Sequence, residues 1–323
     1  MSENDGKLTI RATRIGFLLL DGFAMMSYAA VAEPFRAANV LSGRQLYRWV
    51  HIGRPGADAQ ASSGARIGCD LAVGAIPDID ILFVFAAGDP AGIEDAALFA
   101  WLRMLAARGV RVGGVSGGPY VLAKAGLLDG YRCTIHWEHR PAFVEAFPQL
   151  RVLTGLYVID GDRLTCAGGT AGLDLAIALI AQDHGAALGD AVGEWYIRTQ
   201  LRDSGAAQRL SLRERYGTTS EAVLQALALM EASVEEPLDR ATLARRTGVS
   251  VRQLERLFAR ALGTGMAAQY RRIRLDRAVS LLRETGLSVT QIAMACGFVS
   301  PSHFSRSFKA AFGFSPEHFR RRR

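Results

Sequence analysis

Two stretches near the end of the chain, LARRTGVSVRQLERLF (Leu243–Phe258) and IAMACGFVSPSHFSRSFK (Ile292–Lys309), follow one pattern. In each stretch, an apolar residue and an alanine stand shortly before a turn that combines glycine, a hydrophobic residue and serine. The run that follows places charged or polar side chains on one side of a helix and leucine or phenylalanine on the other. This pattern predicts two helix-turn-helix units. Because a short helix that carries arginine fits the major groove, it also favours sequence-specific binding to duplex DNA.

The positive charge of the chain is concentrated in the same region. The 323 residues carry a formal net charge of +7. Residues 221–323 hold 17 lysines and arginines and 9 aspartates and glutamates, whereas the first 220 residues hold 21 and 22. Neutralising DNA phosphates requires such a local excess of basic side chains. The charge distribution therefore supports a separate C-terminal DNA-binding domain.

Composition and cysteine use are typical of a folded protein in a reducing compartment. Hydrophobic residues make up 50% of the chain and charged residues 21%, which excludes a disordered protein. The four cysteines have no paired spacing, so neither a zinc site nor a disulfide framework is expected. Residues 1–7 contain no signal-peptide core, and the apolar run Ile15–Leu20 is too short to span a membrane. We therefore expect a soluble protein of the cytoplasm that holds no metal or cofactor.

The first two-thirds of the chain alternates β-rich runs with helical stretches. Asp160-Gly161 between two apolar runs adds the signal of a hairpin. Such alternation, with strands that read as buried, predicts an α/β domain with a doubly wound, flavodoxin-like parallel sheet. Strands are expected at 14–20, 48–53, 79–86 and 110–115, and helices at 29–40, 93–107, 120–125 and 171–182.

The chain is expected to have three parts. Residues 1–203 form the α/β domain, and residues 204–219, rich in serine, glycine, glutamine, arginine and threonine, form a linker. Residues 220–323 form the all-α domain with the two helix-turn-helix units. A central helix at 267–283 separates these units, and its length would set the two reading helices about 34 Å apart, one turn of DNA.

The C-terminal hundred residues resemble an AraC/XylS-type DNA-binding domain. The likeness is carried by the two stretches above, by the helix at 271–278 and by Phe312-Gly313 with Ser315-Pro316. One departure is Met266, where that family commonly has proline. The resemblance implies that the two recognition helices present base-reading side chains and that Lys309 contacts a phosphate. The base-reading residues it implies are Arg252, Glu255 and Arg256 in the first helix and Ser302, His303 and Arg306 in the second.

The motif Gly114-Val115-Ser116-Gly117-Gly118 fits the pattern G-x-S-x-G between a predicted strand and a predicted helix. This is the geometry of a nucleophile elbow. An α/β-hydrolase would place its acid and then its histidine on later strands, but His136 follows Ser116 by only 20 residues. That spacing resembles the PfpI/ThiJ group of class I glutamine-amidotransferase-like domains, whose elbow carries cysteine with a histidine close behind.

Almost the whole chain resembles GlxA-type regulators, in which a PfpI-like domain is fused to an AraC-type tail. The resemblance includes Asp21-Gly22-Phe23, Glu33-Pro34 and the segment 167–174. However, Ser116 occupies the cysteine position, and Ser27 stands where enzymes of this fold carry a helper carboxylate. Serine needs a strong base to become nucleophilic, and Glu138 is the only candidate nearby in sequence for the acid that would orient His136. We therefore expect no catalytic residue and interpret the pocket as a sensor.

The expected sensor pocket surrounds the elbow. The backbone amides of Ser116, Gly117 and Gly88 would hold an anion. Tyr28 would offer an aromatic face to a cation, and so would Trp137, which follows His136 in the sequence. Core packing explains His136 and Trp137 equally well. Tyr120 is expected to be a core residue. The segment 133–139 resembles regulators of choline, betaine, carnitine or arginine catabolism, which implies an effector that is a small amine, betaine or amino acid.

These observations leave three hypotheses open. The first is a sequence-specific transcriptional regulator, more specifically an activator, whose non-catalytic PfpI-like domain senses a small amine or amino-acid metabolite. Its partners would be double-stranded promoter DNA, the effector, RNA polymerase and a second copy of the chain. The alternative is a PfpI-like amidase or hydratase that uses Ser116 and has an accessory DNA-binding domain. A third is an architectural DNA protein whose first domain only dimerises.

Overall fold

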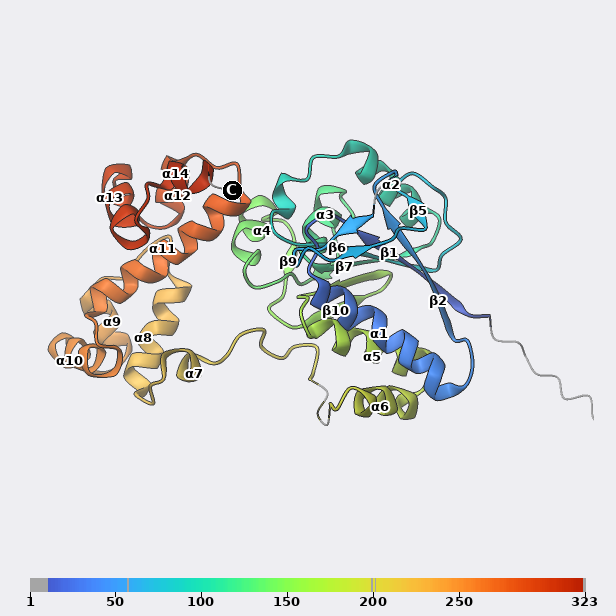
Figure 1. Ribbon diagram of the computed structural model, residues 1–323. Helices are drawn as coiled ribbons and strands as arrows, with labels where there is room; N and C mark the ends of the chain where they lie inside the picture. The colour runs from blue at the N-terminus through green and yellow to red at the C-terminus, as the bar shows by residue number, and fades with distance from the viewer. Residues whose placement is uncertain (1–10, 57, 199, 201, 322–323) are drawn as a thin grey trace, which may run out of the picture. The chain divides into compact units, whose positions relative to one another are not determined.

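The computed structural model of the chain describes residues 11–56, 58–198, 200 and 202–321. The segment 1–7, in which no signal-peptide core was expected, lies outside the described residues. The chain divides into two compact units, which meet in sequence between Gln208 and Arg209 (Figure 1). Among the described residues, no helix has the length and apolar character needed to cross a membrane.

The first unit is built on a seven-stranded sheet with the order β10-β11-β7-β6-β1-β2-β5. All neighbouring strands are parallel except the edge pair β10 and β11, which forms the predicted hairpin around Gly161. The predicted parallel sheet is thus confirmed. The strands are β1 (Thr13–Leu19), β2 (Tyr47–Gly53), β5 (Leu71–Ala72), β6 (Ile81–Ala86), β7 (Arg111–Ser116), β10 (Tyr157–Asp160) and β11 (Arg163–Cys166).

Helices cover both faces of this sheet because its strands are apolar on both sides. Along β1, Phe17 packs in the core below α1 and α5, while the next residue, Leu18, packs in the core below α2 and α3. One face is covered by α1 (Met25–Ser42), α5 (Ala171–His184) and α6 (Ala186–Trp195), and the other by α2 (Ala96–Ala107), α3 (Gly118–Lys124) and α4 (Arg140–Ala146).

Several short elements were not expected from the sequence. They include η1 (Pro90–Gly92) and two small sheets, β3 (Ala59–Gln60) with β4 (Arg66–Ile67) and β8 (Arg132–Cys133) with β9 (Arg151–Val152). Two-residue strands carry no period that a sequence pattern can reveal. They matter here because β8 and β9 lie beside the edge strand β10, where the backbone amide of Arg132 donates to the Asp160 carboxylate at 2.8 Å.

The second unit contains only helices among its described residues. Helices α8, α9, α10 and the start of α11 share a core around Leu254 and Phe258, and Phe304 and Phe308 of α13 pack in the second half. The predicted all-α fold is confirmed. The helices are α7 (Leu212–Tyr216), α8 (Glu221–Ala232), α9 (Arg240–Arg246), α10 (Val251–Leu262), α11 (Met266–Glu284), α12 (Val289–Ala295), α13 (Pro301–Phe312) and α14 (Pro316–Arg321).

The segment 204–219, expected to be a linker, is largely part of the two units. The Ser204 carbonyl accepts a hydrogen bond from the Leu156 amide at 2.7 Å, and the Gln208 side-chain amide donates to the Gly155 carbonyl at 2.7 Å. Further along, Ser211 and Glu214 form a capping box at the start of α7. Sequence composition missed these contacts because polar residues can pair within a domain as well as face water.

Candidate sensor site and nucleic-acid interface

Ser116 lies at the end of β7 in the strained conformation of a nucleophile elbow. Its φ is 61°, in the left-handed region that side chains other than glycine rarely adopt. Glycines on both sides permit the sharp turn into α3. A Cβ on Gly114 would lie 2.6 Å from the Pro119 nitrogen, and one on Gly118 would collide with the Val84 carbonyl oxygen. The geometry predicted from the G-x-S-x-G motif is therefore present.

The Gly117 amide, however, is already used inside the fold. It donates to the Ala86 carbonyl at 2.8 Å, because the hydrogen bonding between β6 and β7 continues one residue past the strands. The expectation that this amide binds an anion is therefore wrong for this structure. Gly88, in the loop after β6, has a φ of 69° and open space where a Cβ would stand.

A glycine loop closes over Ser116. A Cβ on Gly168 would lie 2.6 Å from the Ser116 Cβ and 2.9 Å from the Ser27 hydroxyl, so only glycine fits there. The Ser27 hydroxyl accepts a hydrogen bond from the Gly169 amide at 2.8 Å. Ser27 and Ser116 are both buried. Ser27 thus stabilises this loop, and the elbow serine is packed against backbone.

His136 is connected to the elbow through the main chain. Its backbone amide donates to the Ser116 carbonyl at 3.4 Å, and its ring Nδ1 accepts from the Glu138 amide at 3.3 Å. Burial lowers the pKa of His136 to about 4, and the nearby His139 acts in the same direction. The ring is therefore neutral at pH 7. The Trp137 ring, 42% exposed, lies beside it with 5.4 Å between centroids.

Tyr28, on α1, is partly buried and packs against the core on that face of the sheet. Its hydroxyl lies 2.7 Å from His51 Nε2, and its ring meets Phe17 and Phe23 edge to face. Burial raises the pKa of Tyr28 to about 12. These contacts engage the ring inside the fold, and the expectation that it also contacts a ligand stays a prediction. Tyr120 is 3% exposed and packs against Phe143, as expected for a core residue.

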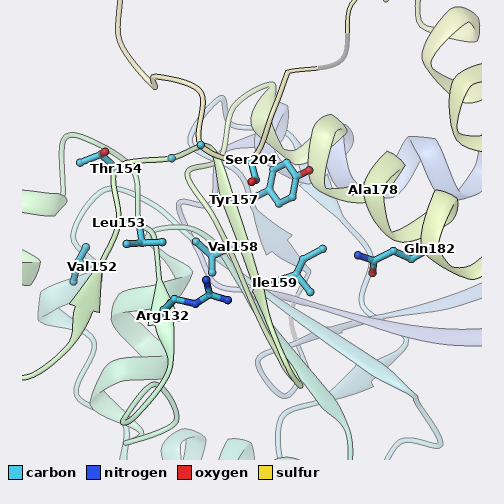
Figure 2. A pocket seen from close by; sticks show the side chains of 12 residues that line it. Arg132, Val152, Leu153, Thr154, Tyr157, Val158, Ile159, Ala178, Gln182 and Ser204 are labelled. Atoms are coloured by element: carbon cyan, nitrogen blue, oxygen red, sulfur yellow. The ribbon is translucent and has the colours of Figure 1, made fainter. Parts of the chain in front are cut away.

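The structure contains a cavity of about 580 Å³ elsewhere, along the edge strand β10 (Figure 2). None of the six ligand-binding residues predicted from the sequence lines it. No sequence signal pointed to this groove, because its walls come from β8, β9, α5 and the segment after Arg202. The residues that line it are Arg132, Val152, Leu153, Thr154, Gly155, Tyr157, Val158, Ile159, Ala178, Gln182, Ser204 and Gly205. Among the described residues, no group of three His, Cys, Asp or Glu side chains could hold a metal ion.

The first recognition helix, α10, exposes two arginines on one side. The Ser250 hydroxyl caps its start by accepting from the Gln253 amide at 3.2 Å. Arg252 and Arg256, one turn apart, are exposed, whereas Leu254 and Phe258 on the opposite side are fully buried. This arrangement agrees with the face that was expected to read bases.

Glu255, expected to contact bases, has a different position. Its carboxylate accepts a hydrogen bond from the Met266 amide at 3.1 Å, at the start of α11, and lies 3.8 Å from Arg240. Gly265, the residue before α11, has no side chain to cap that helix. Glu255 fills this role from the neighbouring helix, and we propose that it caps α11 instead of reading bases.

The second recognition helix, α13, has the same organisation. The Ser300 hydroxyl accepts from the His303 amide at 3.3 Å, and Pro301 occupies the first turn, where its missing N–H costs nothing. Phe304 and Phe308 are fully buried. The four residues expected to contact DNA, namely Ser302, His303, Arg306 and Lys309, are all exposed.

Two residues beside this helix were missed by the sequence analysis. The Arg274 guanidinium donates to the Cys296 and Gly297 carbonyls at 2.7 and 2.6 Å and lies 4.0 Å from the centre of the Phe298 ring. It thereby fixes the turn before α13 to α11. Val299, next to the Ser300 cap, is 100% exposed. An arginine within a basic helix gives no signal of such a role, and a valine in a turn gives no signal of its exposure.

Comparison with protein families agrees with the division into two units. A model of the DJ-1/PfpI family matches residues 13–182, and a model described as a helix-turn-helix domain matches residues 243–322. The chain is 46% identical over 310 residues to the HTH-type transcriptional regulator GlxA of Rhizobium meliloti, covering 96% of each chain. It is 45% identical to the HTH-type transcriptional regulator CdhR of Pseudomonas aeruginosa, covering 93% of this chain and 89% of that one.

Solved structures resemble the first unit. The crystal structure of an AraC family transcriptional regulator from Pseudomonas putida has a TM-score of 0.53 and 28% identity, and covers 57% of this chain and 99% of that one. DJ-1 of Toxoplasma gondii has a TM-score of 0.50 at 17% identity, covers 58% of this chain and 100% of that one, and shares the fold.

Proposed function

Because this chain belongs to the AraC-type transcriptional regulators that carry an N-terminal DJ-1/PfpI domain, we propose that it is a ligand-responsive activator whose first unit senses a small amine or amino-acid metabolite without catalysis. The observation that carries the DNA-binding part is the pair of capped helices α10 and α13. They expose Arg252, Arg256 and Arg306 opposite fully buried leucine and phenylalanine. Exposed arginines on such helices can form paired hydrogen bonds with guanine.

The length of α11 supports binding to two successive turns of the groove. This helix has 19 residues between the two recognition helices, which corresponds to about 28 Å. Together with the flanking turns, this length would place α10 and α13 in the major groove on the same face of the duplex, one helical turn apart. One chain would then read both half-sites.

The chemistry around Ser116 supports a sensor without catalysis. A general base works best when its pKa lies near the working pH, but burial holds the pKa of His136 at about 4. Such a ring is a weak base for a serine hydroxyl. Ser27, in the place of a carboxylate, is engaged with the Gly169 amide. We therefore favour a regulator over an amidase or hydratase, although the strained φ of 61° at Ser116 is the geometry that an enzyme would use.

The proposed partners are promoter DNA, the effector, RNA polymerase and a second copy of the chain. The effector class, a small amine, betaine or amino acid, rests on the resemblance of residues 133–139 to regulators of amine and arginine catabolism. A homodimer through the first unit rests on analogy with the fold. We also propose that the protein acts at the bacterial nucleoid in the cytoplasm.

Binding of the full chain to DNA from its own promoter region tests this function. The dissociation constant should be lower for that DNA than for a random duplex by about 10³ or more at physiological salt. Equal affinity for both duplexes would refute sequence-specific regulation. A thermal-shift screen with amines and amino acids tests the sensor, because a ligand that binds the folded state raises the melting temperature. Activity of the full chain as an amidase, lost in Ser116→Ala, would instead favour the enzyme.

A further inference from the structure

The groove along β10 combines an apolar floor with polar side chains at its ends. Ile159 and Ala178 supply apolar surface between the edge strand and α5, and Val158 supplies it on the side of Arg132. In Figure 2, Arg132 from β8 and Gln182 from α5 point toward Ile159 from opposite sides. Its volume of about 580 Å³ lies within the range of ligand sites, which are mostly apolar with a few polar groups that fix orientation.

Charge distinguishes the two ends of this groove. At the β8 end, the Asp160 carboxylate accepts from Arg132 Nε and Nη2 at 3.4 and 3.2 Å, so the other N–H groups of the guanidinium remain for a further acceptor. Arg132 and Arg151 both keep the pKa of Asp160 below its usual value. Two arginines against one aspartate leave this end positively charged.

The other end of the groove has no such excess of positive charge. Burial raises the pKa of the Tyr157 hydroxyl, and the negative charges of Asp174 and Asp203 act in the same direction. Asp174 is neutralised by Arg198 and Arg202 at 2.7 and 2.8 Å, whereas Asp203 is exposed. These four side chains together carry no net charge, so a second anionic group on a ligand would gain no attraction near Tyr157.

We propose that this groove binds a small monocarboxylate with a short apolar body. The carboxylate is held by Arg132, the body lies on Val158, Ile159 and Ala178, and Gln182 contributes a hydrogen bond. The site is separate from the elbow around Ser116. Ser204 and Gly205, which lie just before the boundary between the two units, form part of its wall, so the bound molecule contacts that segment directly.

Pentanoate is the probe for this site, used with the full chain and observed by NMR of the ligand. Pentanoate should bind, and pentylamine, pentanamide and the dicarboxylate glutarate should bind at least about fivefold more weakly. Arg132→Gln should weaken pentanoate binding about fivefold, whereas Arg108→Gln, which removes the same charge from an exposed position that does not line the groove, should leave it within about twofold. Equal binding of pentanoate and pentylamine would overturn the proposal.

A second pair of variants keeps the test independent of the Arg132–Asp160 contact. Ala178→Trp fills the groove from α5 and should abolish pentanoate binding, whereas Ala187→Trp, on the exposed side of α6, should not. Unchanged binding in Ala178→Trp places the ligand elsewhere and refutes the site. Because these constants are measured without DNA, failure of sequence-specific DNA binding would leave them intact, and the two proposals fail separately.

Discussion

Arg306 is the residue at which loss of one side chain should affect DNA recognition most directly. It is exposed in the middle of α13, while Phe304 and Phe308 on the opposite side hold the helix in place. Arg306→Ala should weaken binding to the promoter site by about 1–3 kcal/mol. Arg108→Ala, an exposed arginine in the first unit, is the charge-matched control and should have little effect. If Arg306→Ala weakens binding to promoter DNA and to random duplex equally, Arg306 contacts a phosphate and does not read a base.

Glu255 should affect stability and not base preference. Glu255→Ala removes the acceptor for the Met266 amide and should lower the free energy of unfolding by about 1 kcal/mol, as loss of a helix cap does. Glu255→Gln keeps an acceptor oxygen and should retain most of that stability. Chemical denaturation measures both variants. Selection of binding sites from random duplexes measures base preference. A changed preference in Glu255→Ala would show that this side chain contacts bases.

His136 should make stability depend on pH in a defined window. Its pKa in the folded state is about 4, below the ordinary value of 6.5, so the unfolded state binds the proton more readily. Stability is therefore complete above pH 6.5 and falls as the pH is lowered toward 4. His136→Gln should remove this term, about 2 kcal/mol between pH 7 and pH 5. Parallel pH profiles of unfolding for both proteins would contradict this.

At the scale of elements, the contact between α11 and the turn of the second helix-turn-helix unit depends on Arg274. Arg274→Gln would leave the Cys296 and Gly297 carbonyls without their donor and remove the contact with Phe298. The cost should be about 1–3 kcal/mol, and amide hydrogen exchange in residues 292–300 should accelerate. Arg271→Gln, exposed one turn earlier on α11, is the control. Unchanged exchange in Arg274→Gln would show that the turn is held by other contacts.

How much of the fold could be predicted from the sequence depended on the length of each element. Strands β1, β6 and β7 were predictable because each is a run of six or seven residues that is largely buried. The elbow at Ser116 was predictable because its glycines leave the chain few other conformations. The groove was not, since it depends on the two-residue strands β8 and β9 meeting β10. The hydrogen bond of the Gly117 amide and the packing of the Tyr28 ring were missed for a related reason, because their partners, Ala86 and Phe17, lie on the strands β6 and β1.

At the scale of the whole molecule, DNA binding and sensing should be separable. The second unit has its own core, which includes Leu254 and Phe258, and residues 221–323 carry the excess of basic side chains. A fragment of residues 209–323 should therefore still prefer promoter DNA over random duplex, while residues 1–208 should bind neither. Because counterions are released, the logarithm of the fragment's binding constant should fall linearly with the logarithm of salt concentration, with a slope of about −0.9 for each phosphate contacted. The full chain is the control. If the fragment folds, as judged by circular dichroism, yet loses its preference, sequence reading would require the first unit.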